Sequence, residues 1–137
     1  MTGPRFHMVG GGPRPVAPFS HAVEEDGWVF VTGQMPTDPA DPAAPPPEGI
    51  EAQTRRVIAN LEIVLGGIGL DLSHVRMCRI YLTDFERDYA AFNEIYKGFF
   101  PEDRRPARTT VGVTALAVGA LVEIDLVAKR PAGEGSA

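Results

Sequence analysis

The chain is poor in cysteine and has no long apolar run, and each of these gaps excludes a class of protein. Its one cysteine, Cys78, cannot form an internal disulfide, which favours a reducing compartment. Because Cys78 lies in a strand-like segment, we expect it to be buried and to act as a small hydrophobic residue. No segment approaches transmembrane length, and no apolar stretch follows Met1 to Arg5 as in a signal peptide. We therefore expect a cytoplasmic protein with no membrane partner.

The sequence also lacks clustered positive charge. The 137 residues carry a formal net charge of -5 at pH 7, and no run of lysines and arginines offsets it. Nucleic-acid surfaces depend on such runs, so we expect no nucleic-acid partner. With 44% hydrophobic residues, the chain suits one domain with a sizeable core. We expect this domain to cover residues 1–130, followed by a flexible C-terminal tail at 131–137.

Turn and strand signals divide the first third of the chain. Glycines and prolines at 10–15 predict a loop. A short strand is expected at Phe19 to Val23, a turn at 25–27, and a second strand at Trp28 to Thr32, which is rich in strand-forming residues. Together these segments predict a hairpin. Residues 38–49 hold five prolines and predict a long exposed loop.

Two amphipathic helices follow, with a strand at Val75 to Leu82 between them. The first begins near Glu51 and ends at the glycines of 66–69, and its apolar residues recur three and four positions apart. In the second, Thr83 and Glu86 predict a capping box. An aromatic stripe with the same spacing is expected to be helix core: Phe85, Tyr89, Phe92, Tyr96 and Phe99.

The last third predicts a hairpin that carries two charged residues. Alternating apolar residues flank a turn at 117–120, in which Gly119 can take a positive φ. In this register Arg108, Thr110 and Glu123 lie on the face away from the core. Arg108 and Glu123 are then about 20 Å apart in one chain. If both act on one small molecule, two subunits must build the site, and the uncovered sheet face becomes an oligomer interface.

The predicted order is β-β-α-β-α-β-β, an α+β fold with a mixed sheet and two helices on one face. At this point the chain resembles the RidA/YjgF family of reactive intermediate deaminases over nearly its whole length. The order and spacing of short matching segments carry the resemblance: Ala17 to Val23, Thr32 to Pro36, Gln53-Thr54, Asn60-Leu61, Thr83 to Phe85, Phe92 to Tyr96, Pro106 to Val111, and Val122 to Ile124.

The resemblance implies a chorismate-mutase-like fold and a homotrimer with active sites between subunits. It also implies hydrolysis of enamines and imines such as 2-iminopropionate to 2-keto acids and ammonia, with no metal or bound cofactor. In this reading Arg108 holds the substrate carboxylate through two parallel hydrogen bonds. Glu123 activates the attacking water.

Further site residues come from the same resemblance. Asn93 matches a residue near the family's site, although it can also cap the helix or bond to the backbone. Thr110 aligns where many members carry cysteine, and its backbone amide can serve the substrate carboxylate. Gly33 is expected either to allow a close backbone approach or to form a sheet bulge. Phe19 stands where many members have tyrosine, so a hydroxyl is missing and the substrate is open. His21 stands where many have glutamine, and we expect a structural role for it.

Alternative readings remain for the site and for the function. Arg108 can be a solvated charge, and Glu123 can pair with Lys129 or Arg130. The whole chain can also be a non-catalytic trimer that binds or senses a small carboxylate in the same cleft. Nuclease activity, reported for some relatives, fits the acidic charge poorly.

Overall fold

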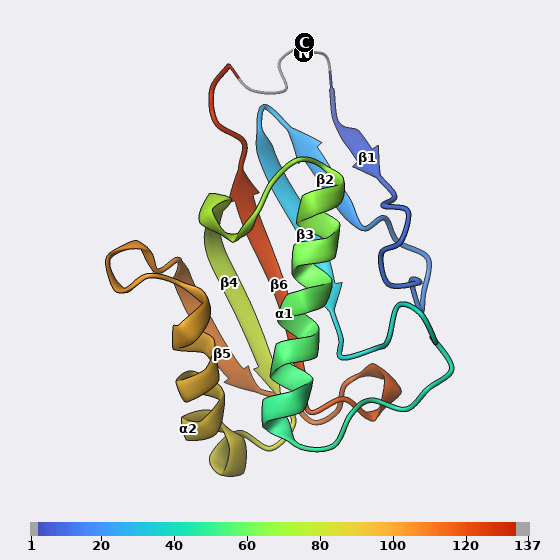
Figure 1. Cartoon of the computed structure of the whole chain (residues 1–137), viewed down its shortest axis with the longest axis vertical. Helices are drawn as coiled ribbons and strands as arrows, with labels where there is room; N and C mark the ends of the chain where they lie inside the picture. Colours follow the sequence, from blue (N-terminus) through green and yellow to red (C-terminus); the bar gives the residue numbers. More distant parts are fainter. Residues whose placement is uncertain (1–2, 134–137) are drawn as a thin grey trace.

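The protein is described here by a computed structural model that covers residues 3–133. Within this range one mixed sheet has six strands in the order β1-β2-β3-β6-β4-β5. Both helices lie on the same face of that sheet, with α2 over the β5 edge (Figure 1). The elements are β1 (Arg5–His7), β2 (Ala22–Glu25), β3 (Trp28–Gln34), α1 (Ile50–Gly67), β4 (Val75–Leu82), α2 (Phe85–Tyr96), β5 (Ala107–Gly112) and β6 (Val122–Lys129). The predicted fold class is confirmed. Most of the expected tail lies outside the described residues.

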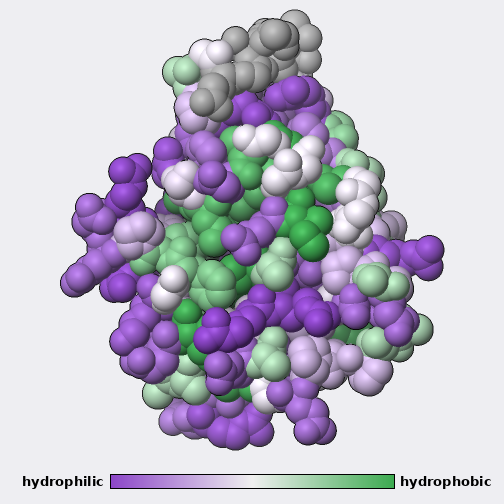
Figure 2. Space-filling view, viewed as in Figure 1, coloured by the Kyte–Doolittle hydropathy of each residue, from purple (hydrophilic) through white to green (hydrophobic). Residues whose placement is uncertain are grey.

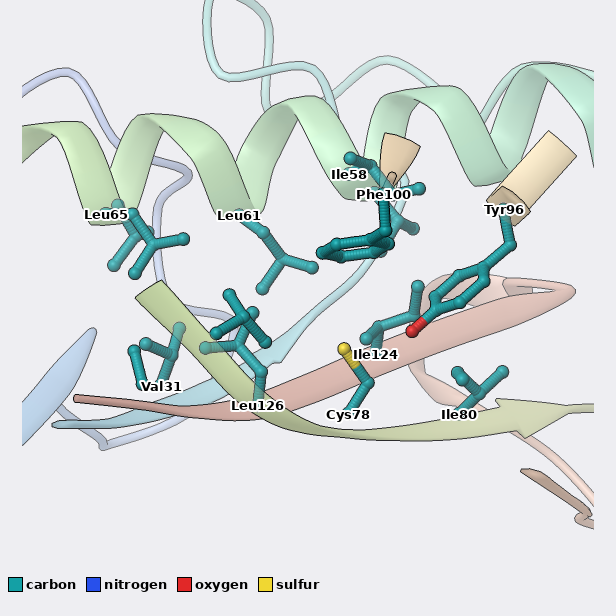
Figure 3. Close-up of a cluster of buried hydrophobic side chains, with 14 of the residues drawn as sticks. Val31, Ile58, Leu61, Leu65, Cys78, Ile80, Tyr96, Phe100, Ile124 and Leu126 are labelled. Atoms are coloured by element: carbon teal, nitrogen blue, oxygen red, sulfur yellow. The ribbon is translucent and has the colours of Figure 1, made fainter. Parts of the chain in front are cut away.

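The core lies between the helices and the sheet. Leu61 and Leu65 of α1 face Val31 and Leu126 of the sheet, and Cys78 of β4 is buried among them (Figure 3). The period of three and four in the sequence thus predicted the buried side of α1 correctly. Cys78 is a small buried residue as expected, and burial raises the pKa of its thiol.

The surface over the helices differs from this core. Hydrophilic residues cover most of this face, and one patch of hydrophobic residues is visible beside α1 (Figure 2). None of the helices in residues 3–133 combines the length and the apolar character needed to cross a membrane.

The first hairpin forms where the sequence predicted it, and a further strand, β1, pairs with it. In the turn between β2 and β3, Asp26 and Gly27 have φ values of 55° and 80°, which suits a two-residue hairpin turn. β2 begins at Ala22 rather than Phe19, and the preceding residues are irregular. The start of the chain is not only a loop, because β1 pairs with β2. Three residues are too few to produce a readable alternation.

The cap of α2 also differs from the prediction. Asp84 is the N-cap residue, and its carboxylate accepts a hydrogen bond from the Arg87 backbone N–H at 3.3 Å. The hydroxyl of Thr83 instead donates to the carbonyl of Ala120. Both residues are good N-caps, so the sequence alone did not separate them.

The predicted hairpin of the last third is wrong. β5 is an edge strand that pairs in parallel with β4, and β6 lies on the other side of β4, where it also pairs with β3. Ile124 therefore faces Ile80 rather than Val113. The turn at 117–119 does have Gly119 at a φ of 67°, but it joins two strands that are not neighbours. Alternation identifies a strand but does not identify its partner.

The sheet face opposite the helices carries an apolar row that the sequence did not predict. Paired positions on five neighbouring strands place apolar side chains side by side: Phe6, Val23, Phe30, Val127 and Met77. Phe6 and Phe30 are 67% and 52% exposed. We call the face that bears this row the open face. An exposed apolar row of this extent indicates a protein interface.

A buried ion network fixes β1 and β2 to the end of the chain's last strand. Glu24 is 2% exposed, and Arg130 donates hydrogen bonds to both of its carboxylate oxygens, at 2.8 and 3.0 Å. Arg5 and His7 contact the same carboxylate. The hydrogen bonds from Arg130 and His7 and the charges of both arginines outweigh burial and lower the pKa of Glu24 from 4.5 to about 2.

We expect this network to make stability depend on acid. The folded pKa lies below the unfolded one, so the stabilisation is complete above about pH 4.5 and disappears as the pH falls toward 2. Glu24→Gln should lower the free energy of unfolding at pH 7 by about 3 kcal/mol. Urea unfolding of both proteins from pH 7 to pH 2 measures the difference. The difference in the free energy of unfolding between wild type and Glu24→Gln should become smaller in acid. Glu25→Gln, at an exposed position, should have the stability of the wild type at every pH. A difference that is the same at every pH contradicts this account.

Candidate active site

Arg108 lies at the β5 edge of the sheet, on the face covered by α2. It pairs with Cys78 of β4, whose side chain is buried under the helices. The Nη2 atom of Arg108 donates a hydrogen bond to Oδ1 of Asn93 on α2, at 2.5 Å. The guanidinium carbon is 4.8 Å from the ring centroid of Tyr96 and 5.5 Å from that of Phe92. These contacts fix the guanidinium in one place.

The aromatic stripe of α2 therefore has two roles. Phe92 and Tyr96 are buried core residues, as predicted, but Tyr89 is 39% exposed, so the prediction that it belongs to the core is wrong. The stripe also contacts Arg108, because the ring centroid of Tyr89 is a further 5.9 Å from the guanidinium carbon. The sequence did not predict this second role. The spacing of Tyr89, Phe92 and Tyr96 around Asn93 was visible, but nothing indicated that β5 would lie beneath them.

Thr110 lies two residues beyond Arg108 on the same face of β5. It pairs with Ile80, whose side chain is fully buried under the helices. The Thr110 Oγ1 atom is buried and has no hydrogen-bond partner within residues 3–133. A buried hydroxyl of this kind has capacity to bind a ligand. Arg108, Asn93 and Thr110 thus form one polar group, which we call the cationic half-site.

Glu123 lies in the middle of the sheet on the open face, because its neighbours Val122 and Ile124 are buried in the core. Its carboxylate packs against the backbone of Gly33 on β3. A Cβ atom added to Gly33 would be only 2.0 Å from the Oε2 atom of Glu123. The pairing of β3 with β6 also shifts between Val31 and Gln34. Gly33 therefore has both of its expected roles, close approach and bulge.

Burial raises the pKa of Glu123, and the nearby negative charge of Asp125 raises it further. Phe19 and Gly33 line one small hollow, together with Arg14 and apolar residues of the loop before β2 and with Gln34, Met35 and Thr37. We call Glu123, Gly33 and Phe19 the acidic half-site, because Gly33 contacts both the Glu123 carboxylate and this hollow. A carboxyl group with a raised pKa suits a proton-transfer role.

Gly33→Ala tests the contact between Gly33 and Glu123. The added methyl group would displace a flexible side-chain end, so we expect the fold to persist while the Glu123 carboxylate moves. Any catalytic rate that depends on Glu123 should then fall by about 10²-fold. Gly98→Ala is a matched control, since nothing lies within 4 Å of its added Cβ. Turnover and thermal unfolding of both variants check this, and a fully active Gly33→Ala protein would remove Gly33 from the site.

His21 has a structural role. The backbone N–H of Val9 donates to its Nδ1 atom at 2.8 Å, and its Nε2 atom donates to the carbonyl of Pro13 at 2.6 Å. Both ring nitrogens are thus engaged in holding the loop that precedes β2. Within residues 3–133 no three histidine, cysteine, aspartate or glutamate side chains are grouped so as to hold a metal ion.

The two half-sites are on opposite faces of the sheet in one chain. The prediction that Arg108 and Thr110 share the open face with Glu123 is wrong, because β5 pairs with β4 and not with β6. The 20 Å separation assumed the wrong register. In the observed register Arg108 and Glu123 are two strands apart and offset by three residues, or roughly 14 Å in the plane of the sheet. Neither side chain can reach a small molecule held by the other.

Comparison with known proteins gives consistent results. Residues 11–130 match the family model described as Endoribonuclease L-PSP. Protein DfrA of Myxococcus xanthus is 44% identical over 118 residues, which are 85% of this chain and 88% of DfrA. The 3-aminoacrylate deaminase RutC of Acinetobacter baylyi is 37% identical over 86% of this chain and 91% of its own. The Rid protein YyfA from Yersinia pestis has a TM-score of 0.85 and 32% identity, over 93% of this chain and 99% of its own.

Proposed function

The chain belongs to the RidA/YjgF family, whose members include the RutC proteins, and on that premise we propose that it hydrolyses small 2-imino acids or their enamines. The observation that carries the proposal is the pair of half-sites, one with a fixed guanidinium and one with a half-buried carboxyl group of raised pKa. A named 3-aminoacrylate deaminase at 37% identity supports the same reaction class.

The proposed reaction adds water to a carbon–nitrogen double bond. The imine reacts in its protonated, iminium form. Glu123 takes a proton from the water as the water oxygen forms a bond to the iminium carbon and the π electrons of the carbon–nitrogen bond move to the nitrogen. The resulting tetrahedral carbinolamine then loses ammonia as the carbon–oxygen double bond forms. Glu123 returns its proton to the departing nitrogen, and the hydroxyl proton passes to the released ammonia, so water and iminium give a 2-keto acid and ammonium. The raised pKa of Glu123 suits both steps, because the group must accept a proton and then donate it.

Arg108 binds the substrate carboxylate in this proposal. Asn93 and the rings of Tyr96 and Phe92 hold the guanidinium in place before the substrate arrives. A planar guanidinium donates two parallel hydrogen bonds to a carboxylate, whereas an ammonium group cannot. The hydroxyl of Thr110 has no partner in the described chain and adds a further hydrogen-bonding group beside Arg108.

Two subunits must supply one complete site. Because the half-sites face opposite ways in one chain, we propose a homotrimer in which the cationic half-site of one protomer meets the acidic half-site of its neighbour. The apolar row on the open face supports burial of that face between subunits. The acidic half-site lies on this same face.

The family description also refers to an endoribonuclease. A net charge of -5, with no more than two consecutive cationic residues anywhere, disfavours binding of an RNA backbone. Deamination is therefore the activity that we propose.

The test generates 2-iminopropionate in situ and follows its decay with and without the protein. We expect decay well above the buffer rate, and the product to be pyruvate and ammonia in equal amounts. Binding of a 2-keto acid without faster decay would instead support a carboxylate-sensing trimer. Cleavage of RNA without imine hydrolysis would contradict the proposal.

A further inference from the structure

A second carboxylate lies beside Glu123 on the open face. Asp125 is two residues along β6, so the two side chains project from the same face about 7 Å apart. Arg79 donates to both carboxylate oxygens of Asp125, from Nε at 2.8 Å and from Nη2 at 3.1 Å. The hydroxyl of Tyr81 donates to Oδ2 at 2.9 Å. Asp125 thus receives three hydrogen bonds, and its side chain is 18% exposed.

The register of β4 and β6 sets this arrangement. Arg79 pairs with Asp125, and Tyr81 pairs with Glu123. Although Tyr81 is directly across from Glu123, its hydroxyl is bound to Asp125 and does not occupy Glu123. On the other side, β3 contributes the uncharged Thr32, Gly33 and Gln34, and Arg14 lines the adjoining hollow. The charged and titratable groups beside Glu123 on β4 and β6 are therefore Asp125, Arg79 and Tyr81, while Arg14 lines the hollow next to Gly33.

We propose that Asp125 is a positioning residue for the hydrolysis and that its charge helps to set the charge state of Glu123. Arg79 and Tyr81 regulate how strongly Asp125 acts on Glu123. This inference rests on the proposed role of Glu123. Two negative charges this close destabilise each other, so Asp125 favours the protonated form of Glu123. Arg79 opposes the effect by neutralising part of the charge on Asp125. Tyr81 fixes the orientation of the Asp125 carboxylate and leaves both oxygens of Glu123 free for the substrate and water.

The raised pKa of Glu123 agrees with this geometry. Burial is the larger cause of the raised pKa of Glu123, and Asp125 is the second. Burial alone would fix the pH below which Glu123 is protonated and cannot accept a proton. The charges of Asp125 and Arg79 give the protein a means of adjusting that pH. The working pH of the enzyme is thus controlled by a cluster that does not touch the substrate.

The test measures kcat/KM against pH for two variants that change the cluster in opposite ways. Asp125→Asn removes the negative charge and should move the acid limb of the profile about 0.5 to 1 unit lower. Arg79→Met leaves the charge of Asp125 without its cation and should move the same limb higher. The side chain of Arg79 is 62% exposed, so its replacement leaves the core intact. A loss of packing changes rates but does not move the limb in two directions.

Matched controls separate this cluster from general charge effects. Lys129→Met removes a cation from the same strand and face six residues away, about 20 Å from Glu123, and Asp103→Asn removes an exposed carboxylate. Neither should move the limb. If Glu123→Gln abolishes activity but both cluster variants keep the wild-type profile, the inference about Asp125 is wrong and the proposed function stands. If Glu123→Gln keeps full activity, the proposed function itself fails.

Discussion

Replacing Glu123 by glutamine is expected to lower kcat for imine hydrolysis by about 10² to 10⁴-fold, with little change in KM. Glutamine has nearly the same shape and still fits against Gly33, but it cannot accept the proton of the attacking water. The carboxylate of the substrate is bound by Arg108 in this account, so ground-state binding should persist. Steady-state kinetics with 2-iminopropionate generated in situ measure the effect.

A control variant makes the same change from glutamate to glutamine away from the site. Glu62→Gln makes the same replacement on the exposed side of α1 and should leave kcat unchanged. Because burial raises the pKa of Glu123, the wild-type activity should fall on the acid side at a pH above the usual range of a glutamate. Glu123→Gln should remove that limb from whatever activity remains. A Glu123→Gln protein with wild-type kcat would exclude this residue as the base.

Arg108→Ala is expected to act on binding as well as on rate. It removes the partner of a desolvated substrate carboxylate, which costs about 2 to 5 kcal/mol and corresponds to a loss in kcat/KM of roughly 30-fold to several thousand-fold. KM should rise, in contrast to Glu123→Gln. Arg108→Lys should recover little, because an ammonium group cannot make two parallel hydrogen bonds or stack on Tyr96 in the same way.

An exposed arginine in the turn before β5 supplies the control for Arg108. Arg104→Ala removes an exposed cation four residues earlier and should leave kcat/KM within about twofold, since surface charges contribute little to binding of a small molecule at a distance. Calorimetric titration with a 2-keto acid provides an independent measurement. Equal affinity of wild type and Arg108→Ala for that ligand would remove Arg108 from the carboxylate site.

The two helices and the longer strands were predictable because their signals are local, whereas the three-residue β1 was not. The side of α1 that is buried follows from the period of its apolar residues, and β4 was predicted with its observed bounds. The partner of β5 was not predictable in this way. Its burial is weakly alternating and it pairs through residues far away in the sequence, so the alternation of Val111 and Val113 did not distinguish β4 from β6.

The candidate site shows the same limit. The family resemblance pointed to Arg108 and Glu123, but their faces depend on strand pairing, and the wrong hairpin placed both on one face. One change of partner moved Arg108 under α2, beside Asn93 and Tyr96. The cluster of Arg79, Tyr81 and Asp125 was also missed, because its members belong to two strands that are more than 40 residues apart. Only the register brings them together.

The central claim is that one active site takes its guanidinium from one protomer and its carboxyl group from another. Mixing inactive Arg108→Ala and Glu123→Gln proteins, after reversible dissociation and reassembly, tests it directly. If the site is shared, random mixing restores both residues in roughly a quarter of the sites, and deaminase activity should reappear in that proportion. If each chain contains a complete site of its own, no mixed oligomer holds an intact one, and a mixture that stays inactive would contradict the claim.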